Sequence, residues 1–244
     1  MWWAGPATGV GKKVAAVQSN YIPWKGYFDL INMADEFILA DDAKYTKRDW
    51  RNRNRIVTPN GVRWLTLPVA HEHVEPFRRI CETRVGDRLW ARKHWAVLAH
   101  NYRRAPYFEQ YRDQFQDVYR ELAAEEFLSW INFRLIVLVC EILGIKTKIS
   151  WSMQFPWVPG KNERIIEICR AVGATEYISG PAAKTYIEEE KLAAAGIRLT
   201  YIDYSGYPEY RQLHVPFEHA VSIIDLIFNT GPDASRYMMS VGVA

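Results

Sequence analysis

Apolar and polar residues follow one another along this chain in blocks that predict strands and helices in turn. Short apolar runs that end in polar or turn-forming residues predict strands at 14–18, 36–40, 62–67, 148–152, 176–179 and 197–202. Apolar residues at every third or fourth position predict helices at 24–34, 87–122 with a break at Pro106, 123–143, 162–172, 183–195 and 217–228. Residues 56–57 and 62 onward, around the turn at 59–61, predict a hairpin.

Strands alternate with helices at both ends of the chain, around a helical middle. This order predicts an α/β fold of three layers with a mainly parallel sheet, Rossmann-like or nucleotidylyltransferase-like, with a helical insertion. We expect a single α/β domain over 12–244, the insertion at about 87–145, and a flexible lead-in at 1–11.

The segment after the first predicted strand is the most informative one. It carries hydrogen-bonding side chains and large rings where a plain connection would favour small polar residues. Because ligands of α/β proteins bind at the carboxyl ends of the strands, we interpret this segment as the floor of a pocket. The alternative is an aromatic loop that only packs on its neighbours. The candidate substrate-binding residues are Gln18, Asn20, Tyr21, Trp24 and Tyr27.

Other predicted strands also end in polar residues. Asp41 and Asp42 follow the second strand, Gly180 follows 176–179, and Asp203 follows the last strand. Gly180 is a further candidate substrate-binding residue. If these strands are parallel, all of these residues meet at one edge of the sheet. Asp42 is the carboxylate that we select as a candidate catalytic residue, with a structural cap as its alternative role.

A cluster of Arg and Asn residues lies between 48 and 55. Guanidinium groups match the geometry of phosphate and carboxylate, and Asn supplies both a donor and an acceptor. An anion clamp is our first interpretation, while a solvated basic loop and a nucleic-acid contact stay open. The candidate substrate-binding residues here are Arg48, Asn52, Arg53 and Asn54.

The histidines give two further catalytic candidates, His94 and His100. They lie six residues apart on one predicted helix, so they point to different sides and cannot both serve one site. Tyr102 and Tyr107 gather beside Pro106 and are added to the substrate-binding candidates. The pair His71–His73 resembles a metal pair but has no third ligand nearby, and we predict no metal site.

Composition narrows the classes of protein further. The chain has 244 residues, 14% aromatic residues, a net charge of +3 and three widely spaced cysteines. No basic face is broad enough to indicate a general nucleic-acid binder, and no apolar run is long enough for a membrane span. The P-loop, G-x-G-x-x-G, G-x-S-x-G and H-E-x-x-H motifs are missing from the sequence. We expect a cytoplasmic protein, as a monomer or a homodimer.

Several motifs in order resemble the WbqC-like protein family, from Val14 to about Gly231. They include the segment 18–28, the Arg/Asn cluster 47–56, Trp64 to Val69, 105–108, 177–180, 210–212 and 222–226. The resemblance implies a role in bacterial gene clusters for O-antigen and other surface glycans. It also adds Tyr210 and Gln212 to the candidate substrate-binding residues. A fainter likeness places Trp24 and Tyr27 where nucleotidylyltransferase-like folds carry the two histidines of a His-x-Gly-His element.

These observations lead to three hypotheses. The first is a transferase that moves an acyl or aminoacyl group to the amino group of a nucleotide-linked amino sugar. The second is an ATP-dependent nucleotidyltransferase or ligase on the same fold. The third is a non-catalytic accessory protein of a glycan assembly complex. No motif identifies a cofactor, and the activated acyl or aminoacyl donor, or ATP, would be the partner besides the sugar nucleotide.

Overall fold

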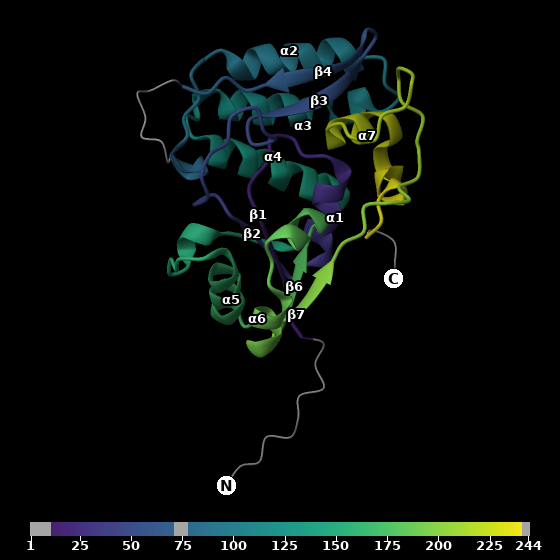
Figure 1. The fold of residues 1–244 in the computed structure, drawn as a ribbon. Helices are drawn as coiled ribbons and strands as arrows, with labels where there is room; N and C mark the ends of the chain where they lie inside the picture. Colours follow the sequence, from purple (N-terminus) through teal and green to yellow (C-terminus); the bar gives the residue numbers. More distant parts are fainter. Residues whose placement is uncertain (1–10, 71–77, 241–244) are drawn as a thin grey trace.

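The computed structural model describes residues 11–70 and 78–240, and its centre is a five-stranded parallel sheet (Figure 1). The strand order is β5-β2-β1-β6-β7, with β1 in the middle. The strands are β1 (Lys13–Val17), β2 (Glu36–Leu39), β5 (Lys148–Trp151), β6 (Glu176–Ser179) and β7 (Arg198–Tyr201). Each of the four ladders is parallel, so the carboxyl ends of all five strands lie at the same edge.

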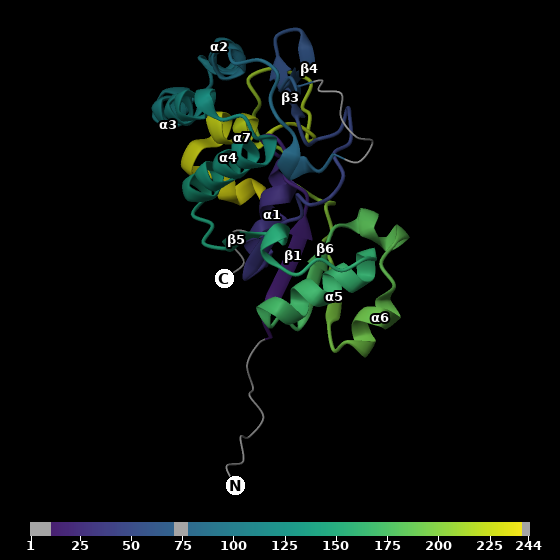
Figure 2. The ribbon, with the colours of Figure 1, turned by 90° about the vertical axis from the view of Figure 1, so that its left-hand side faces the viewer.

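Helices cover both faces of this sheet, which confirms the three-layer, Rossmann-like α/β fold. Ala15, Phe37 and Leu39 point into the larger core, which they share with α1 (Lys25–Met33), α4 (Leu128–Leu143) and α7 (Ile223–Thr230). Val14 and Ile38 point to the opposite face, against α5 (Lys161–Val172) and α6 (Glu189–Ala194). Figure 2 shows α5 and α6 on one side of the strands and α1, α4 and α7 on the other.

A long insertion separates β2 from β5. Its described residues contain a two-stranded antiparallel hairpin, which the sequence predicted around the turn at 59–61, and three α-helices. These elements are β3 (Arg53–Thr58), β4 (Gly61–Thr66), α2 (Trp90–Tyr102), α3 (Phe108–Glu121) and α4. In Figure 1 the arrows of β6 and β7 point toward this part of the molecule, which therefore lies beyond the carboxyl edge of the sheet.

The predicted break at Pro106 falls between α2 and α3, and Gly144 ends α4 in a left-handed conformation with φ +71°. Short 3-10 helices connect several elements in the described residues. They are η1 (Ile80–Glu82), η2 (Leu122–Ala124), η3 (Ser152–Gln154), η4 (Pro181–Thr185) and η5 (Gly231–Tyr237).

Two predicted helices are shorter than expected. The helix predicted at 183–195 is divided into η4 and α6, because Asn162 binds the backbone in between: its amide donates to the Tyr186 carbonyl at 3.2 Å and its oxygen accepts from the Glu188 N–H at 3.0 Å. The helix predicted at 217–228 begins only at Ile223, since Arg55 binds the preceding backbone. The Arg55 carbonyl accepts from the Ser222 N–H at 2.8 Å.

The lead-in 1–10 and the pair His71–His73 lie outside the described residues. Across 11–70 and 78–240, no helix is long and apolar enough to cross a membrane. Within the same ranges, no group of three or more His, Cys, Asp or Glu side chains is arranged to hold a metal ion. The three cysteines are free thiols.

Candidate functional site

The order of the parallel strands reverses between β1 and β6. From β1 the chain moves outward to β2 and β5, and it then returns to β6 and β7 on the other side of β1. In open α/β sheets a crevice for ligands forms at the carboxyl ends of the strands, at this type of reversal.

The ladder between the central strand and β6 is short at this reversal, and the Tyr177 hydroxyl donates to the Ala16 carbonyl at 3.2 Å beyond it. The ladder between β1 and β6 pairs Lys13 with Glu176 and Val14 with Tyr177. Beyond this point Ala16, Val17 and Gln18 stay half-buried, although β1 has a neighbouring strand on both sides. We therefore take the carboxyl half of β1 and the loop after it as the candidate site.

A buried polar network fixes the loop after β1. The Ser19 N–H donates to Oδ1 of Asp41 at 2.8 Å, and the Ser129 hydroxyl donates to the other oxygen of the same carboxylate. The Asn132 amide donates to Oγ of Ser19 at 3.0 Å. Burial raises the pKa of Asp41 in spite of these hydrogen bonds. The network joins the ends of β1 and β2 to α4, so this loop has one defined shape.

Arg51 brings a positive charge to the same loop. Its guanidinium donates to the carbonyls of Gln18 at 3.3 Å and Ser19 at 3.5 Å, and to the side-chain oxygen of Asn20. The nearest carboxylate paired with it is Asp49, at 3.7 Å. Arg51 therefore holds the loop at Gln18 and Asn20 through hydrogen bonds and adds a positive charge beside the carboxyl end of β1.

Two predicted candidates, Asn52 and Asn54, hold the hairpin against this loop. The Asn54 amide donates to the carbonyls of Tyr21 at 3.1 Å and Ile22 at 2.8 Å. Ile22 has φ +37°, an unusual value for a β-branched residue, and these hydrogen bonds stabilise it. The Asn52 amide donates to the Leu67 carbonyl at 2.8 Å. Both Asn side chains are buried and act on the protein itself in this structure.

Aromatic rings from the segments after β1 and β7 meet at the carboxyl edge of the sheet, beside Gly180 after β6. The ring centroid of Trp24 lies 5.1 Å from that of Tyr204 and 5.7 Å from that of Tyr207. The Tyr204 hydroxyl lies 3.5 Å from the position that a Cβ would take on Gly180. Trp24 is half-buried, so part of its ring is open to a ligand. The segments after β1, β6 and β7 thus form one wall.

Lys25 lies behind this wall. Its ammonium group donates to the Pro208 carbonyl at 3.2 Å and lies 4.7 Å from the centroid of the Tyr207 ring. Burial lowers the pKa of Lys25 to about 8, although Asp29 acts in the opposite direction. The candidate Tyr27 is also buried, and its hydroxyl donates to the Gln18 carbonyl at 3.1 Å.

Asp42 stands at the carboxyl end of β2, on the side of α5. The Ser152 hydroxyl donates to its Oδ1 at 2.6 Å, and Nη2 of Arg164 lies 2.9 Å from its Oδ2. Among the three catalytic candidates, Asp42 is the one that directly follows a strand of the sheet.

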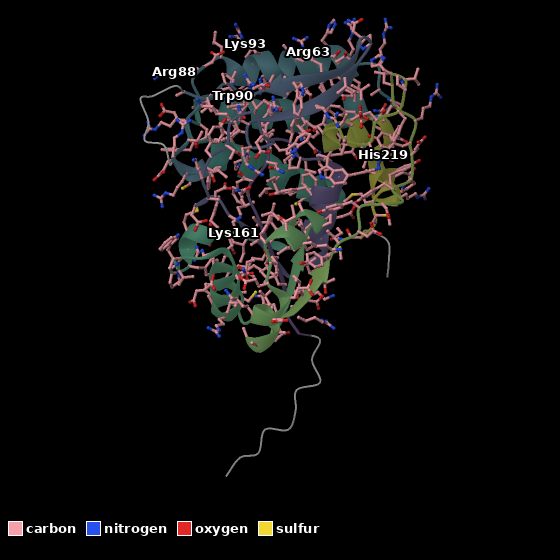
Figure 3. All side chains as sticks on the ribbon, in the orientation of Figure 1. Arg63, Arg88, Trp90, Lys93, Lys161 and His219 are labelled. Carbon is pink, nitrogen blue, oxygen red and sulfur yellow. The ribbon has the colours of Figure 1, made fainter. Side chains whose placement is uncertain are left out.

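His94 is buried inside the helical insertion. Its Nδ1 shares a hydrogen bond of 2.7 Å with the Tyr21 hydroxyl, and its Nε2 lies 3.1 Å from the Thr66 carbonyl. Burial lowers the pKa of His94 to about 4. Its ring also contacts Trp90, which lies with α2 in the upper part of Figure 3, whereas Lys161 marks α5 in the lower part. His94 therefore contacts the loop after β1 through Tyr21, but both of its ring nitrogens are engaged within the protein.

His100 lies near the end of α2 and is exposed. It lines a cleft of about 430 Å³ with Asn101, Arg63 and the turn of the hairpin. Tyr107 contacts the segment at Gly231, and its N–H donates to the Phe228 carbonyl at 3.0 Å. These two candidates therefore belong to the helical part and not to the strand ends.

Tyr102, Tyr210 and Gln212 converge on one buried carboxylate, Asp225. The Tyr102 hydroxyl donates to Oδ2 at 2.9 Å, while the Tyr210 hydroxyl and the Gln212 amide donate to Oδ1 at 2.8 and 2.9 Å. Burial raises the pKa of Asp225. This network joins α2, α7 and the loop after β7 within the larger core.

Arg53 lies on the outward face of the hairpin, and Arg48 lies in the exposed turn before it. Arg53 donates to the Arg48 carbonyl, and its guanidinium lies 4.1 Å from the centroid of the Trp64 ring. The cluster that the sequence suggested as one clamp is thus divided. Arg51 bonds the loop after β1, whereas Arg53 points outward. The two residues are two positions apart, so a regular strand would place both on the same face; they differ because β3 begins only at Arg53.

Comparisons with known proteins agree with the resemblance. The profile of the WbqC-like protein family matches residues 18–237. The chain belongs to the WbqC-like protein family. It is 47% identical over 227 residues to the uncharacterized protein Rv1507c of Mycobacterium tuberculosis (strain ATCC 25618 / H37Rv). The alignment covers 93% of this chain and 97% of the relative. No solved structure gives a significant match.

Sequence reasoning missed several residues of this WbqC-like site. Ser19 was passed over between Gln18 and Asn20, and Arg51 was left out of the clamp. The alternation of Arg and Asn indicates inward positions for Asn52 and Asn54, but it would have placed Arg51 outward with Arg53, so no local pattern indicated the role of Arg51. For Asn132, in the middle of an apolar helix, the signal was a polar residue on a buried face. Tyr204 and Tyr207 lie in a loop whose path no pattern predicted.

Proposed function

We propose that this WbqC-like protein is a cytoplasmic transferase that adds an acyl or aminoacyl group to the amino group of a nucleotide-linked amino sugar. The observation that carries the proposal is the half-buried carboxyl half of the central strand, where its ladder with β6 stops, at the reversal of strand order. The association of the family with surface-glycan gene clusters supports the choice of a sugar nucleotide as substrate.

The reaction needs an acceptor amine and an activated donor, either a thioester or a mixed anhydride with a phosphate. The amine nitrogen attacks the carbonyl carbon of the donor, and a C–N bond forms. The bond from this carbon to the leaving group breaks, and the leaving group departs with the electron pair. The amine gives up one proton, which a base accepts.

In this proposal Gln18 and Asn20 hydrogen-bond the sugar, and the exposed part of Trp24 stacks on its ring. Arg51 supports the loop and contributes positive charge for the phosphates. Asp42 accepts the proton of the amine, because its carboxylate stands at the strand edge. His94 is buried and both of its ring nitrogens are engaged, by the Tyr21 hydroxyl and the Thr66 carbonyl, so it is not free for this step and holds Tyr21 in place.

Binding of sugar nucleotides tests the proposal directly. Ligands that bind the native state raise the thermal midpoint, so UDP- and dTDP-linked amino sugars should raise it in the wild-type protein. The variant Asn20→Ala should lose most of this shift. Asn101→Ala is a matched control, since Asn101 is also half-buried but its amide bonds the Val97 carbonyl within α2.

The two alternatives give different results in the same experiment. A shift that requires ATP and magnesium, without any response to sugar nucleotides, would favour the ligase. No shift with any of these compounds would favour the accessory protein. An equal shift in the wild type and in Asn20→Ala would remove the crevice as the binding site.

A further inference from the structure

The outward face of the β3–β4 hairpin carries rings and guanidinium groups that the crevice does not use. Along β3, Asn54 and Ile56 are buried, while Arg53 and Arg55 are half-exposed. Arg55 lies directly opposite Trp64 in the antiparallel ladder. Hence the hairpin buries one face against the protein and presents Arg53, Arg55 and Trp64 on the other.

Trp50, which precedes the hairpin, completes this surface. The centroids of the Trp50 and Trp64 rings are 5.2 Å apart and their planes are tilted by 43°. The Arg53 guanidinium lies 4.1 Å from the Trp64 centroid, and that of Arg55 lies 5.9 Å from the Trp50 centroid. Trp50 is 39% exposed and Trp64 is 41% exposed. We call Trp50, Arg53, Arg55 and Trp64 the indole–guanidinium platform.

The platform is the centre of a strong local charge. Residues 44–63 contain seven Lys and Arg and one Asp, a net charge of +6, whereas the whole chain has +3. Glu218 compensates Arg55 only weakly, since it lies 3.7 Å from its guanidinium. The hydrogen bond that Arg53 makes is to the Arg48 carbonyl, which carries no net charge. A ligand with several negative charges would fit this surface.

Exposed indole rings beside guanidinium groups match one class of ligand well. An aromatic base stacks on indole rings, and phosphates accept paired hydrogen bonds from guanidinium groups. A nucleoside joined to two or more phosphates carries both features at the right spacing for neighbouring side chains.

The platform is connected to the crevice through two adjacent residues. The Trp50 carbonyl accepts a hydrogen bond from the Tyr21 N–H at 3.0 Å, and the next residue, Arg51, bonds the carbonyl of Gln18. A ligand on the platform would therefore lie on the same loop system that shapes the crevice.

We propose that the indole–guanidinium platform binds the nucleoside polyphosphate part of the activated acyl or aminoacyl donor. This rests on the proposed function, in which a sugar nucleotide occupies the crevice. The transfer then needs a second site for the donor, and donors activated as coenzyme A thioesters carry an adenosine nucleotide with a 5'-diphosphate. The base stacks on Trp50 and Trp64, and Arg53 and Arg55 bind the phosphates.

Calorimetry with ADP and with coenzyme A tests this site. Both compounds should bind the wild-type protein, and Trp64→Ala should raise their Kd about tenfold or more. Arg53→Ala should also raise the Kd and should weaken its dependence on salt. Two controls should bind as the wild type does. Trp130→Ala removes an indole on α4 that is 42% exposed, and Arg88→Ala removes an exposed guanidinium before α2. Figure 3 shows Arg88 at the side of the molecule, well separated from Arg63 of the hairpin.

Three results would overturn the platform. One is the failure of ADP and coenzyme A to bind the wild type at millimolar concentration. Another is an unchanged Kd in Trp64→Ala and Arg53→Ala variants whose circular dichroism shows a native fold. A third is a ten-nucleotide oligo-dT that binds far more tightly than ADP and depends on Trp64, which would indicate single-stranded nucleic acid instead.

The two proposals fail in different ways. If Asn20→Ala abolishes binding of sugar nucleotides while Trp64→Ala leaves ADP and coenzyme A unaffected, the platform is wrong and the proposed function stands. If Trp64→Ala weakens ADP binding while sugar nucleotides do not bind at all, the proposed transfer is wrong.

Discussion

His94 should make the protein lose stability on mild acidification. Burial lowers its pKa from 6.5 to about 4 in the folded state, so between these values the unfolded chain binds a proton that the folded protein does not. The free energy of unfolding therefore falls as the pH falls through this window. Once the pH is below 4, the whole pKa difference of His94 has lowered the free energy of unfolding by about 3 kcal/mol. About 2 kcal/mol of it should be lost between pH 8 and pH 5.

Urea unfolding at pH 8 and pH 5 measures this loss. The comparison is with His94→Gln, whose amide accepts a hydrogen bond from Tyr21 but does not titrate. The contributions of the other titratable groups to the pH dependence are the same in both proteins and cancel in the comparison. Glu36, with a pKa lowered to about 2, loses its contribution only below about pH 4.5. The drop from pH 8 to pH 5 should be larger in the wild type by about 2 kcal/mol. Equal drops in both proteins would show that His94 is not a buried neutral imidazole.

Three further substitutions test the packing around the candidate site. Gly26→Ala places a Cβ 2.4 Å from the Trp24 ring, so it should displace this ring and destabilise the protein by about 1–3 kcal/mol, measured by urea unfolding; an unchanged midpoint would contradict the close contact. Asp225→Ala leaves the Tyr210 hydroxyl buried without its acceptor and should lower the free energy of unfolding by about 1–3 kcal/mol. A decrease below about 0.5 kcal/mol would argue against the network. The lowered pKa of Lys25 in the folded state should make the free energy of unfolding rise as the pH rises from 8 toward 10.5. The variant Lys25→Met should lack this rise in the same assay.

The local order of short apolar runs and helical segments in the sequence predicted the parallel sheet. The strand beginning near Val14 and the one beginning at Glu36 are separated by one helix, so a parallel pair was the expected result. Gly144 ended its helix as predicted, because only a residue without a side chain takes a left-handed conformation easily. The convergence of strand ends followed from parallel strands alone.

The composition of the candidate site was harder to predict, since it depends on contacts between distant segments. Tyr21 looked like a ligand ring, but the hairpin and α2 cover it, and its hydroxyl contacts His94. Tyr210 and Tyr102 are 108 positions apart in the chain and meet at Asp225, a pairing that no local pattern contains. A tyrosine has an apolar ring and a polar hydroxyl whether it lies in the core or binds a ligand, so the sequence alone does not distinguish the two roles.

The central position of β1 has a consequence for the newly made chain. β1 leaves the ribosome first, but its partner β6 begins at Glu176, after the whole helical insertion. At typical rates of synthesis the nascent protein spends about 8–30 s with one side of this apolar strand uncovered. Throughout this interval its backbone amides could pair with foreign chains. We therefore expect yields of recombinant protein to depend on chaperones that shield nascent strands.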